Sequence, residues 1–422
     1  MQLTRHASKY PSLRGLLSQL YAEAMSGSPS PYIRYFARVR HRDDDRFFGI
    51  KPADRMSHIY IVGKTGTGKT TLLETLLAGD IADRHGCALL DPHGDLATRI
   101  ARTATSAQRR RMVVVDPAAS NSRVSFNPLA RPLPELRPLV AAGLLDVFKM
   151  MWSDAWGSRM EHVLRNALLA LLDQPKATLP DILALISDDA FRAKAVQHIQ
   201  NAQVRKYWEQ EFPNYAKRYR GDAIAPIQSK VGALLADPRL YRFFTSNSKP
   251  LRLRRVMDEG QVLIINLAKG RLGADSSALL GGVLTTMLGA AAFSRVAEPV
   301  AERRPFFIYI DEFQNFTTLA VAEMMAELRK TGVSLILAHQ FLNQLSPPIR
   351  HSVLGNAGTL ISFRVGAEDA AYLAKEFEPK FQRLDLVSLP NFHIYLRLLI
   401  DGAPSKPFSA TTVDSTALRR PF

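Results

Sequence analysis

The sequence predicts an α/β fold with a mostly parallel central sheet and an inserted all-α domain. Apolar runs rich in β-branched residues recur along the chain, and they are continuous rather than alternating, which is typical of strands covered on both faces. Segments with helical spacing follow most of these runs. Between about 135 and 255, apolar residues recur at helical intervals without such a run. The predicted strands are HIYIVG (58–63), CALLD (87–91), MVVVD (112–116), QVLIINL (261–267), FFIYID (306–311), SLILAHQ (334–340), TLISFRV (359–365) and IYLRLLI (394–400).

These patterns divide the 422 residues into four segments. A chain of this length exceeds the size at which one hydrophobic core keeps growing, so several domains are expected. The four segments are an N-terminal arm (1–45), a first part of the α/β domain (46–134), the all-α insertion (135–255), and a second part with a C-terminal tail (256–422). The proline-rich stretch NPLARPLPELRP is the predicted entry to the insertion.

The composition is that of a globular protein with a basic surface. The 55 Lys and Arg residues exceed the 39 Asp and Glu residues, which gives a net charge of +16. Such a charge favours a polyanionic partner, either nucleic acid or an acidic membrane surface. The single cysteine, Cys87, excludes an internal disulfide and is expected to be a small core residue.

One uncharged run, SSALLGGVLTTMLGAAAFS (276–294), approaches the length of a membrane span. It is rich in small residues, which allow a helix to lie close to its neighbours, and aromatic residues do not flank it. We therefore expect a buried helix, no transmembrane segment and a cytoplasmic location.

The segment GKTGTGKT (63–70) matches the phosphate-binding P-loop motif at every fixed position. It follows an apolar strand and opens a helical segment, which is the context that the motif requires. Backbone amides and the helix N-terminus can surround the phosphates of ATP, Lys69 can neutralise them, and the Thr70 hydroxyl can bind Mg²⁺. The expected ATP-binding residues are Gly63, Lys64, Thr65, Gly66, Thr67, Gly68, Lys69, Thr70 and Thr71.

Two predicted strands end on an aspartate, and a single nucleotide needs one principal magnesium carboxylate. FFIYIDE presents Asp311 and Glu312 together, so Asp311 can bind Mg²⁺ while Glu312 polarises the attacking water. LLDPHGD has no adjacent glutamate, so we assign the metal to Asp311. For Asp91 and His93 we leave open a supporting hydrogen-bond role, a contact with a neighbouring subunit, or a simple turn.

The next strand, LILAHQ, ends on Gln340. A polar side chain at that position can contact both the γ-phosphate and the attacking water, so Gln340 is a candidate sensor of the nucleotide state.

Five segments together resemble the coupling ATPases of conjugative type IV secretion, which belong to one superfamily with the HerA and FtsK DNA pumps. The resemblance covers roughly residues 46–410 and implies a RecA-like P-loop motor with an all-α domain. It also implies a homo-hexameric ring that moves DNA at the expense of ATP. The five segments are GKTGTGKT, ALLDPHGDLA, IYIDEFQNF, ELRKTGVSLILAHQ and GNAGTLISFRVGAEDA.

In such rings a basic residue from the next subunit completes the hydrolysis site. The resemblance points to Arg329 in ELRKTG, with Arg364 in FRVG as the reserve candidate. From the residues alone, Arg329 and Lys330 could equally be surface charges that complement a helix dipole.

The stretch 191–255 contains fourteen Lys or Arg residues and four Asp or Glu residues, with aromatic residues among them. This combination suits phosphate contacts and base stacking. Trp208, Phe212 and Tyr215 could instead form the core of the insertion, with the cations solvated outside.

These observations favour an ATP-driven DNA translocase that couples DNA to a conjugative secretion system. The alternatives are a cytosolic HerA-like DNA pump, an ATP-switched adaptor that recruits nucleoprotein substrates, and an ATPase that drives protein secretion. Coupling proteins usually begin with transmembrane helices, and this chain departs from that pattern. Peripheral attachment to the inner membrane would then depend on partners such as a relaxase or proteins of the secretion channel.

Overall fold

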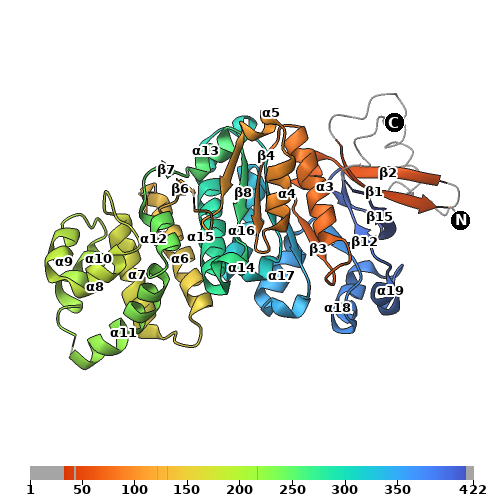
Figure 1. The fold of residues 1–422 in the computed structure, drawn as a ribbon. Helices are drawn as coiled ribbons and strands as arrows, with labels where there is room; N and C mark the ends of the chain where they lie inside the picture. Colours follow the sequence, from red (N-terminus) through yellow and green to blue (C-terminus); the bar gives the residue numbers. More distant parts are fainter. Residues whose placement is uncertain (1–32, 42–43, 121, 131, 216, 415–422) are drawn as a thin grey trace, which may run out of the picture. The chain divides into compact units, whose positions relative to one another are not determined.

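The structure is a computed structural model that describes residues 33–41, 44–120, 122–130, 132–215 and 217–414 (Figure 1). These residues form two compact units. The first unit contains the described residues up to 83 together with 334–346 and 353–414, and the second contains 84–333 and 347–352. Most of the predicted N-terminal arm lies outside the described residues.

Seven strands described in the first unit are hydrogen-bonded side by side in the order β2-β1-β15-β12-β11-β3-β10. The strands β11, β3 and β10 run parallel, whereas the others pair antiparallel. Strand β3, which precedes the P-loop, is fully buried, as its continuous apolar sequence predicts. The strand bounds are β1 (Arg34–His41), β2 (Asp44–Ile50), β3 (Ile59–Val62), β10 (Val333–His339), β11 (Thr359–Ser362), β12 (His393–Arg397) and β15 (Phe408–Thr412).

The helices of the first unit include α3, which begins directly at the P-loop. A buried ion pair fixes α3 near its C-terminal end, because Nη1 and Nη2 of Arg55 donate to the two carboxylate oxygens of Asp80, at 2.7 and 2.8 Å. The bounds are α2 (Pro52–Arg55), α3 (Lys69–Ala82), η7 (Leu342–Gln344), α18 (Ala367–Phe377) and α19 (Arg383–Ser388), with a short hairpin of β13 (Leu399–Ile400) and β14 (Ala403–Pro404). Helix α17 (Pro347–Asn356) contributes residues to both units.

Four strands described in the second unit are hydrogen-bonded in parallel in the order β9-β4-β8-β5. Every residue of β4, β8 and β9 is buried, so the prediction of strands covered on both faces is confirmed for them. Cys87 is a buried core residue of β4, as expected. The bounds are β4 (Gly86–Asp91), β5 (Met112–Val115), β8 (Val262–Asn266) and β9 (Phe306–Ile310), with a minor pair of β6 (Val124–Ser125) and β7 (Lys249–Pro250).

Connecting helices of the second unit follow these strands. They are α4 (Asp95–Thr103), α5 (Ser106–Arg109), α13 (Leu253–Asp258), α14 (Lys269–Leu272), α15 (Ala274–Phe293), η3 (Ser294–Ala297), η4 (Val300–Glu302), η5 (Phe313–Asn315), α16 (Leu319–Leu328) and η6 (Arg329–Thr331).

From 134 to 245 the residues that the structure describes form helices and loops without a strand. In Figure 1 the helices α7 to α11, yellow to green, gather beyond α6 and α12, away from the strands of this unit. Trp208 and Phe212 are buried, and their ring centroids lie 4.7 Å apart. The bounds are η1 (Pro134–Leu136), α6 (Arg137–Met151), α7 (Ser158–Leu172), α8 (Asp181–Ser187), α9 (Asp189–Val196), α10 (Ala202–Lys206), the π-helix η2 (Tyr207–Glu211), α11 (Lys217–Leu235) and α12 (Pro238–Thr245).

Helix α15 contains the long uncharged run. Its length and composition would permit a membrane span, but 72% of its most apolar window is buried within the protein, so the prediction of a buried helix is confirmed. Small residues explain the packing. A Cβ added at Gly281 would lie 2.1 Å from the ring of Phe316, and one at Gly289 would lie 2.4 Å from the sulfur of Met324. Larger side chains at these glycines would displace those neighbours.

Candidate nucleotide-binding and hydrolysis residues

The P-loop of the first unit has the backbone conformation that its glycines allow. Gly66 and Gly68 have φ angles of +76° and +117°, which other residues rarely adopt. Helix α3 begins at Lys69, and no side chain caps its N-terminus at Gly68. The first amides of α3 are therefore oriented as in an anion-binding helix terminus.

Lys69 is buried and folded onto its own loop. Its Nζ donates hydrogen bonds to the main-chain oxygens of Gly63, at 2.6 Å, and Lys64, at 3.1 Å. These are neutral acceptors for a full positive charge, and phosphate oxygens are stronger acceptors for the same ammonium group. The loop therefore fits a polyphosphate.

Gln340 lies beside the P-loop in the same unit. The Thr65 hydroxyl donates to Oε1 of Gln340 at 2.8 Å, so the proposed sensor already contacts the phosphate-binding loop. His339 is buried just before it, and its Nδ1 lies 3.1 Å from the Tyr60 hydroxyl. Burial, together with the charge of Lys69, lowers the pKa of His339 to about 3, so the imidazole is neutral at physiological pH.

Asp311 and Glu312 follow β9 in the second unit, and both are buried. Oδ1 of Asp311 accepts a hydrogen bond from the backbone N–H of Glu312 at 2.9 Å. Glu312 has a φ of +46°, a left-handed conformation that is uncommon for a residue with a side chain. Gln314, which the sequence analysis missed, donates from Nε2 to Oε2 of Glu312 at 2.8 Å. The strained backbone of Glu312 and the hydrogen bond from the Gln314 amide indicate that the Glu312 carboxylate is kept in one orientation.

The motif after β4 makes different contacts from the one after β9. Oδ1 of Asp91 accepts the N–H of His93, and Oδ2 accepts the N–H of Ala97 in the first turn of α4, both at 2.9 Å. Asp91 therefore holds its own loop and the start of α4, which lacks a side-chain cap at Gly94. The His93 side chain is exposed, and its Nε2 lies 3.9 Å from Oε1 of Glu312.

The two arginine candidates differ in their surroundings. Arg329 is exposed at the C-terminal end of α16, and its side chain forms no hydrogen bond or ion pair with another residue that the structure describes. Arg364 in the first unit binds its own chain, because its guanidinium donates to the Leu389 oxygen and to the Asn391 side chain, at 3.1 and 3.0 Å.

The aromatic residues of the helical segment belong mainly to its core. Trp208 and Phe212 are buried, which supports the core alternative, while Tyr215 is half-buried and donates to Glu211 at 2.6 Å. The side chains of 216–220, which include much of the predicted basic run, lie outside those described.

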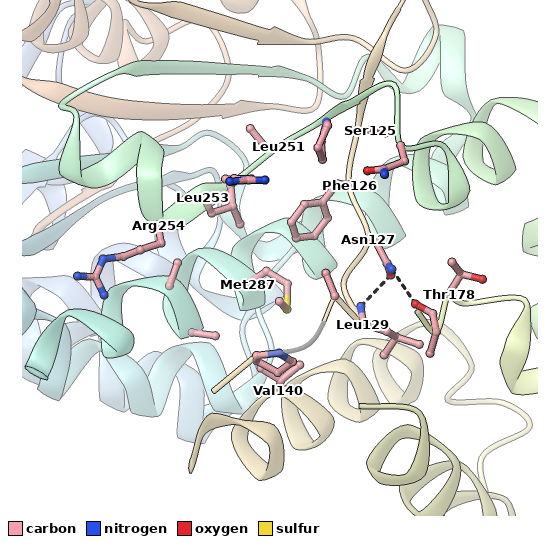
Figure 2. A pocket seen from close by; sticks show the side chains of 18 of the residues that line it. Ser125, Phe126, Asn127, Leu129, Val140, Thr178, Leu251, Leu253, Arg254 and Met287 are labelled. Carbon is pink, nitrogen blue, oxygen red and sulfur yellow. Dashed lines mark hydrogen bonds between the residues drawn. The ribbon is translucent and has the colours of Figure 1, made fainter. Parts of the chain in front are cut away.

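A cavity of about 860 Å³ lies in the second unit, lined by residues of β6, α6 and α15 among others (Figure 2). Figure 2 shows Phe126, Leu253 and Met287 among its apolar lining. The Asn127 side chain donates to the main-chain oxygen of Ala177 at 2.7 Å and accepts from the N–H of Leu129 at 3.0 Å. No residue of the P-loop or of the Asp-Glu pair lines this cavity, so it is distinct from the candidate hydrolysis residues.

The strands, the P-loop and the Asp-Glu pair define a RecA-like P-loop ATPase fold. The chain belongs to the type IV secretion-system coupling proteins, since the family model described as "Type IV secretion-system coupling protein DNA-binding domain" matches residues 49–377. A comparison with curated proteins gave no match.

Solved structures share the fold at low sequence identity. The bacterial conjugative coupling protein TrwBdeltaN70 is 13% identical with a TM-score of 0.65, over 93% of this chain and 91% of that one. TrwB with a non-hydrolysable ATP analogue is 14% identical with a TM-score of 0.62, over 91% and 94% of the two chains. VirB4 of Thermoanaerobacter pseudethanolicus is 13% identical with a TM-score of 0.62, over 93% and 99%.

Proposed function

We propose that this coupling protein is an ATP-driven DNA translocase of a conjugative, type IV secretion-like transfer system. The observation that carries the proposal is that the chain has both a complete P-loop and a buried Asp-Glu pair, whose glutamate is held in a strained conformation. A protein that used ATP only as an assembly switch would not need an oriented second carboxylate, because binding requires only the phosphate loop and one metal ligand.

ATP with Mg²⁺ is the proposed nucleotide. TrwB, which shares the fold, has been solved with a non-hydrolysable ATP analogue and with ADP and Mg²⁺. The Thr70 hydroxyl and the Asp311 carboxylate would hold the metal, which lowers the charge on the phosphates when bound. Among the described residues no group of three His, Cys, Asp or Glu side chains could bind a metal by itself. Two protein oxygens suit Mg²⁺, because this ion usually keeps waters and binds substrate phosphates.

The roles of the other residues follow from their chemistry. The ammonium group of Lys69 would exchange the main-chain oxygens of Gly63 and Lys64 for β- and γ-phosphate oxygens. Glu312 would orient the attacking water and accept its proton, with Gln314 limiting the motion of the carboxylate. Gln340 would respond to the γ-phosphate and pass that change to Thr65 of the P-loop.

DNA is the proposed cargo. The matching family model is described as a DNA-binding domain, and the excess of cations between 191 and 255 supports a nucleic-acid surface. Lys206 and Arg242 are exposed cations in this stretch. We further propose a homo-hexamer in which Arg329 reaches the nucleotide of the neighbouring subunit, and contacts with a relaxase or secretion-channel proteins that bring the protein to the inner membrane.

The test is the ATPase rate measured without DNA and with single- and double-stranded DNA. Stimulation by either form is expected. Lys69→Ala should abolish hydrolysis, because the transferring phosphoryl group loses its main cation, whereas Glu312→Gln should bind ATP without hydrolysing it. An ATPase rate that neither DNA form changes would contradict the translocase and favour the ATP-switched adaptor.

A further inference from the structure

Phe392, immediately before β12, is an exposed aromatic residue in a strained backbone conformation. The side chain is 46% exposed, and the residue has a φ of +66°. The left-handed region is unfavourable for a bulky side chain, and such residues persist where the surrounding structure holds them and where function requires it. No sequence motif marks this residue.

Hydrogen bonds on both sides hold Phe392 against the P-loop. Its N–H donates to the main-chain oxygen of Thr67 at 2.8 Å. Its own oxygen accepts from Thr412, from the N–H at 2.9 Å and from the hydroxyl at 3.2 Å. The preceding residues are fixed as well, because the Arg364 guanidinium binds Leu389 and Asn391. The position of Phe392 is therefore determined by several independent contacts.

The ring of Phe392 touches the P-loop itself. A Cβ added at Gly68 would lie 2.8 Å from Cδ1 of Phe392 and 3.1 Å from Cε1 of Phe363. Phe363 is fully buried, whereas nearly half of Phe392 is exposed to solvent. The fold thus places an apolar ring beside the phosphate-binding loop and leaves part of it uncovered.

We propose that Phe392 forms a wall of the nucleobase subsite and that its ring packs against the base of the bound nucleotide. This inference rests on the proposed binding of ATP. A purine has apolar faces that stack favourably on aromatic side chains, and a base that covers Phe392 would remove the exposed part of the ring from water. Stacking involves the face of the base and forms no hydrogen bonds with its edge. This contact therefore favours binding of nucleotides over inorganic triphosphate but does not distinguish adenine from guanine.

The experiment compares Phe392→Asn with Phe392→Trp. Asparagine tolerates the left-handed conformation, so Phe392→Asn removes the ring while keeping the backbone. Leu384→Ala is the matched control, because Leu384 is an apolar residue of the same unit that is 80% exposed. Dissociation constants are measured for ATP, GTP and inorganic tripolyphosphate on the full chain.

Phe392→Asn should weaken ATP and GTP binding about 5- to 150-fold, the range expected for one base–aromatic stack. Tripolyphosphate binding should stay unchanged, because this ligand uses the P-loop alone. Phe392→Trp should bind nucleotides close to wild type, and so should Leu384→Ala.

Two results would overturn the inference. Equal losses of ATP and tripolyphosphate binding would mean that Phe392 supports the P-loop without contacting the base. Unchanged ATP binding in Phe392→Asn would place the base elsewhere, although the proposed ATPase would still stand. Conversely, the wild-type protein could bind ATP more tightly than tripolyphosphate while its ATPase rate does not respond to DNA. That result would support the nucleobase subsite and contradict the proposed DNA translocase.

Discussion

Nε2 of His93 lies 3.9 Å from Oε1 of Glu312, although the two residues are more than two hundred positions apart in the chain. Strands β4 and β9 are parallel neighbours, with Leu90 opposite Ile310, so the residues that follow them meet at one edge of the sheet. The His93 side chain is 57% exposed and that of Glu312 is 8% exposed. An imidazole that solvent can reach therefore borders the carboxylate assigned to water activation.

Replacement of His93 with Ala should lower kcat for ATP by roughly three- to tenfold, the range expected for loss of one modest polar interaction. KM should change little, because His93 would act on Glu312 rather than on the nucleotide. His93→Gln should recover part of the rate. Steady-state ATPase kinetics measure both constants, and His198→Ala, at another exposed histidine of the second unit, is the control. A His93→Ala enzyme with wild-type kcat would show that the proximity has no effect on hydrolysis.

The two aspartates at strand ends should respond differently to removal of their charge. Asp311→Asn should lower the magnesium-dependent ATPase rate by about 100-fold or more, because a direct metal ligand is lost. Asp91→Asn should retain most of the rate and lose about 1 kcal/mol of stability, since Asp91 accepts hydrogen bonds from its own loop and from α4. ATPase titrations with Mg²⁺ and urea unfolding separate the two effects. Equal losses of activity would contradict the assignment of the metal to Asp311.

Arg329→Ala should lose most turnover while ATP affinity stays nearly unchanged, because a trans-acting arginine interacts mainly with the transition state. Mixing is the decisive measurement. An Arg329→Ala subunit keeps its own P-loop, and a Lys69→Ala subunit keeps the arginine that it donates. The two inactive variants should therefore recover ATPase activity when they assemble together.

The controls for this prediction use the same positions. A Lys69→Ala, Arg329→Ala double variant mixed with Arg329→Ala should stay inactive. Lys330→Ala should behave like wild type, because Lys330 pairs with Glu327 of its own chain at 2.7 Å. Rings that mix without any return of activity would mean that Arg329 acts within its own subunit or that several intact neighbours are needed.

His339 should make the stability of the protein depend on pH in the acidic range. Its pKa is about 3 in the folded chain and 6.5 ordinarily. Between these values the unfolded chain binds a proton that the folded chain does not, so acidification from pH 6.5 toward 3 should lower the free energy of unfolding. The contribution is fully present above pH 6.5, and its steepest slope is about 1.4 kcal/mol per pH unit. In urea unfolding at several pH values, the free energy of unfolding should depend less steeply on pH for His339→Gln than for the wild type. Identical slopes for the two proteins would contradict a lowered pKa of His339 in the folded chain.

The sequence predicted several local features of this protein correctly, although the predicted strands that correspond to β5 and β12 are not buried on both faces. Continuous apolar runs identified buried strands such as β3, β4 and β9. A strand covered on both faces needs apolar residues at every position, so its sequence does not alternate between apolar and polar residues. The small residues of α15 indicated a buried helix, and the spacing of GKTGTGKT identified the P-loop. Strands β1 and β2 were not anticipated. They pair with each other as antiparallel neighbours, and β1 joins the sheet through β15, at the far end of the chain.

Only the tertiary structure decided which distant side chains meet. His93 approaches Glu312 because β4 and β9 are neighbours in the sheet, and Phe392 reaches Thr67 because β12 begins beside the P-loop. The left-handed conformations of Glu312 and Phe392 have no sequence signature. Phe392 is held by hydrogen bonds with Thr67 and Thr412, which are distant in the sequence, whereas Glu312 is bonded within its own segment, to Asp311 and Gln314. Residue spacing specifies what a segment can form by itself, whereas strand order and register bring segments together across hundreds of residues, and these depend on the packing of the whole chain.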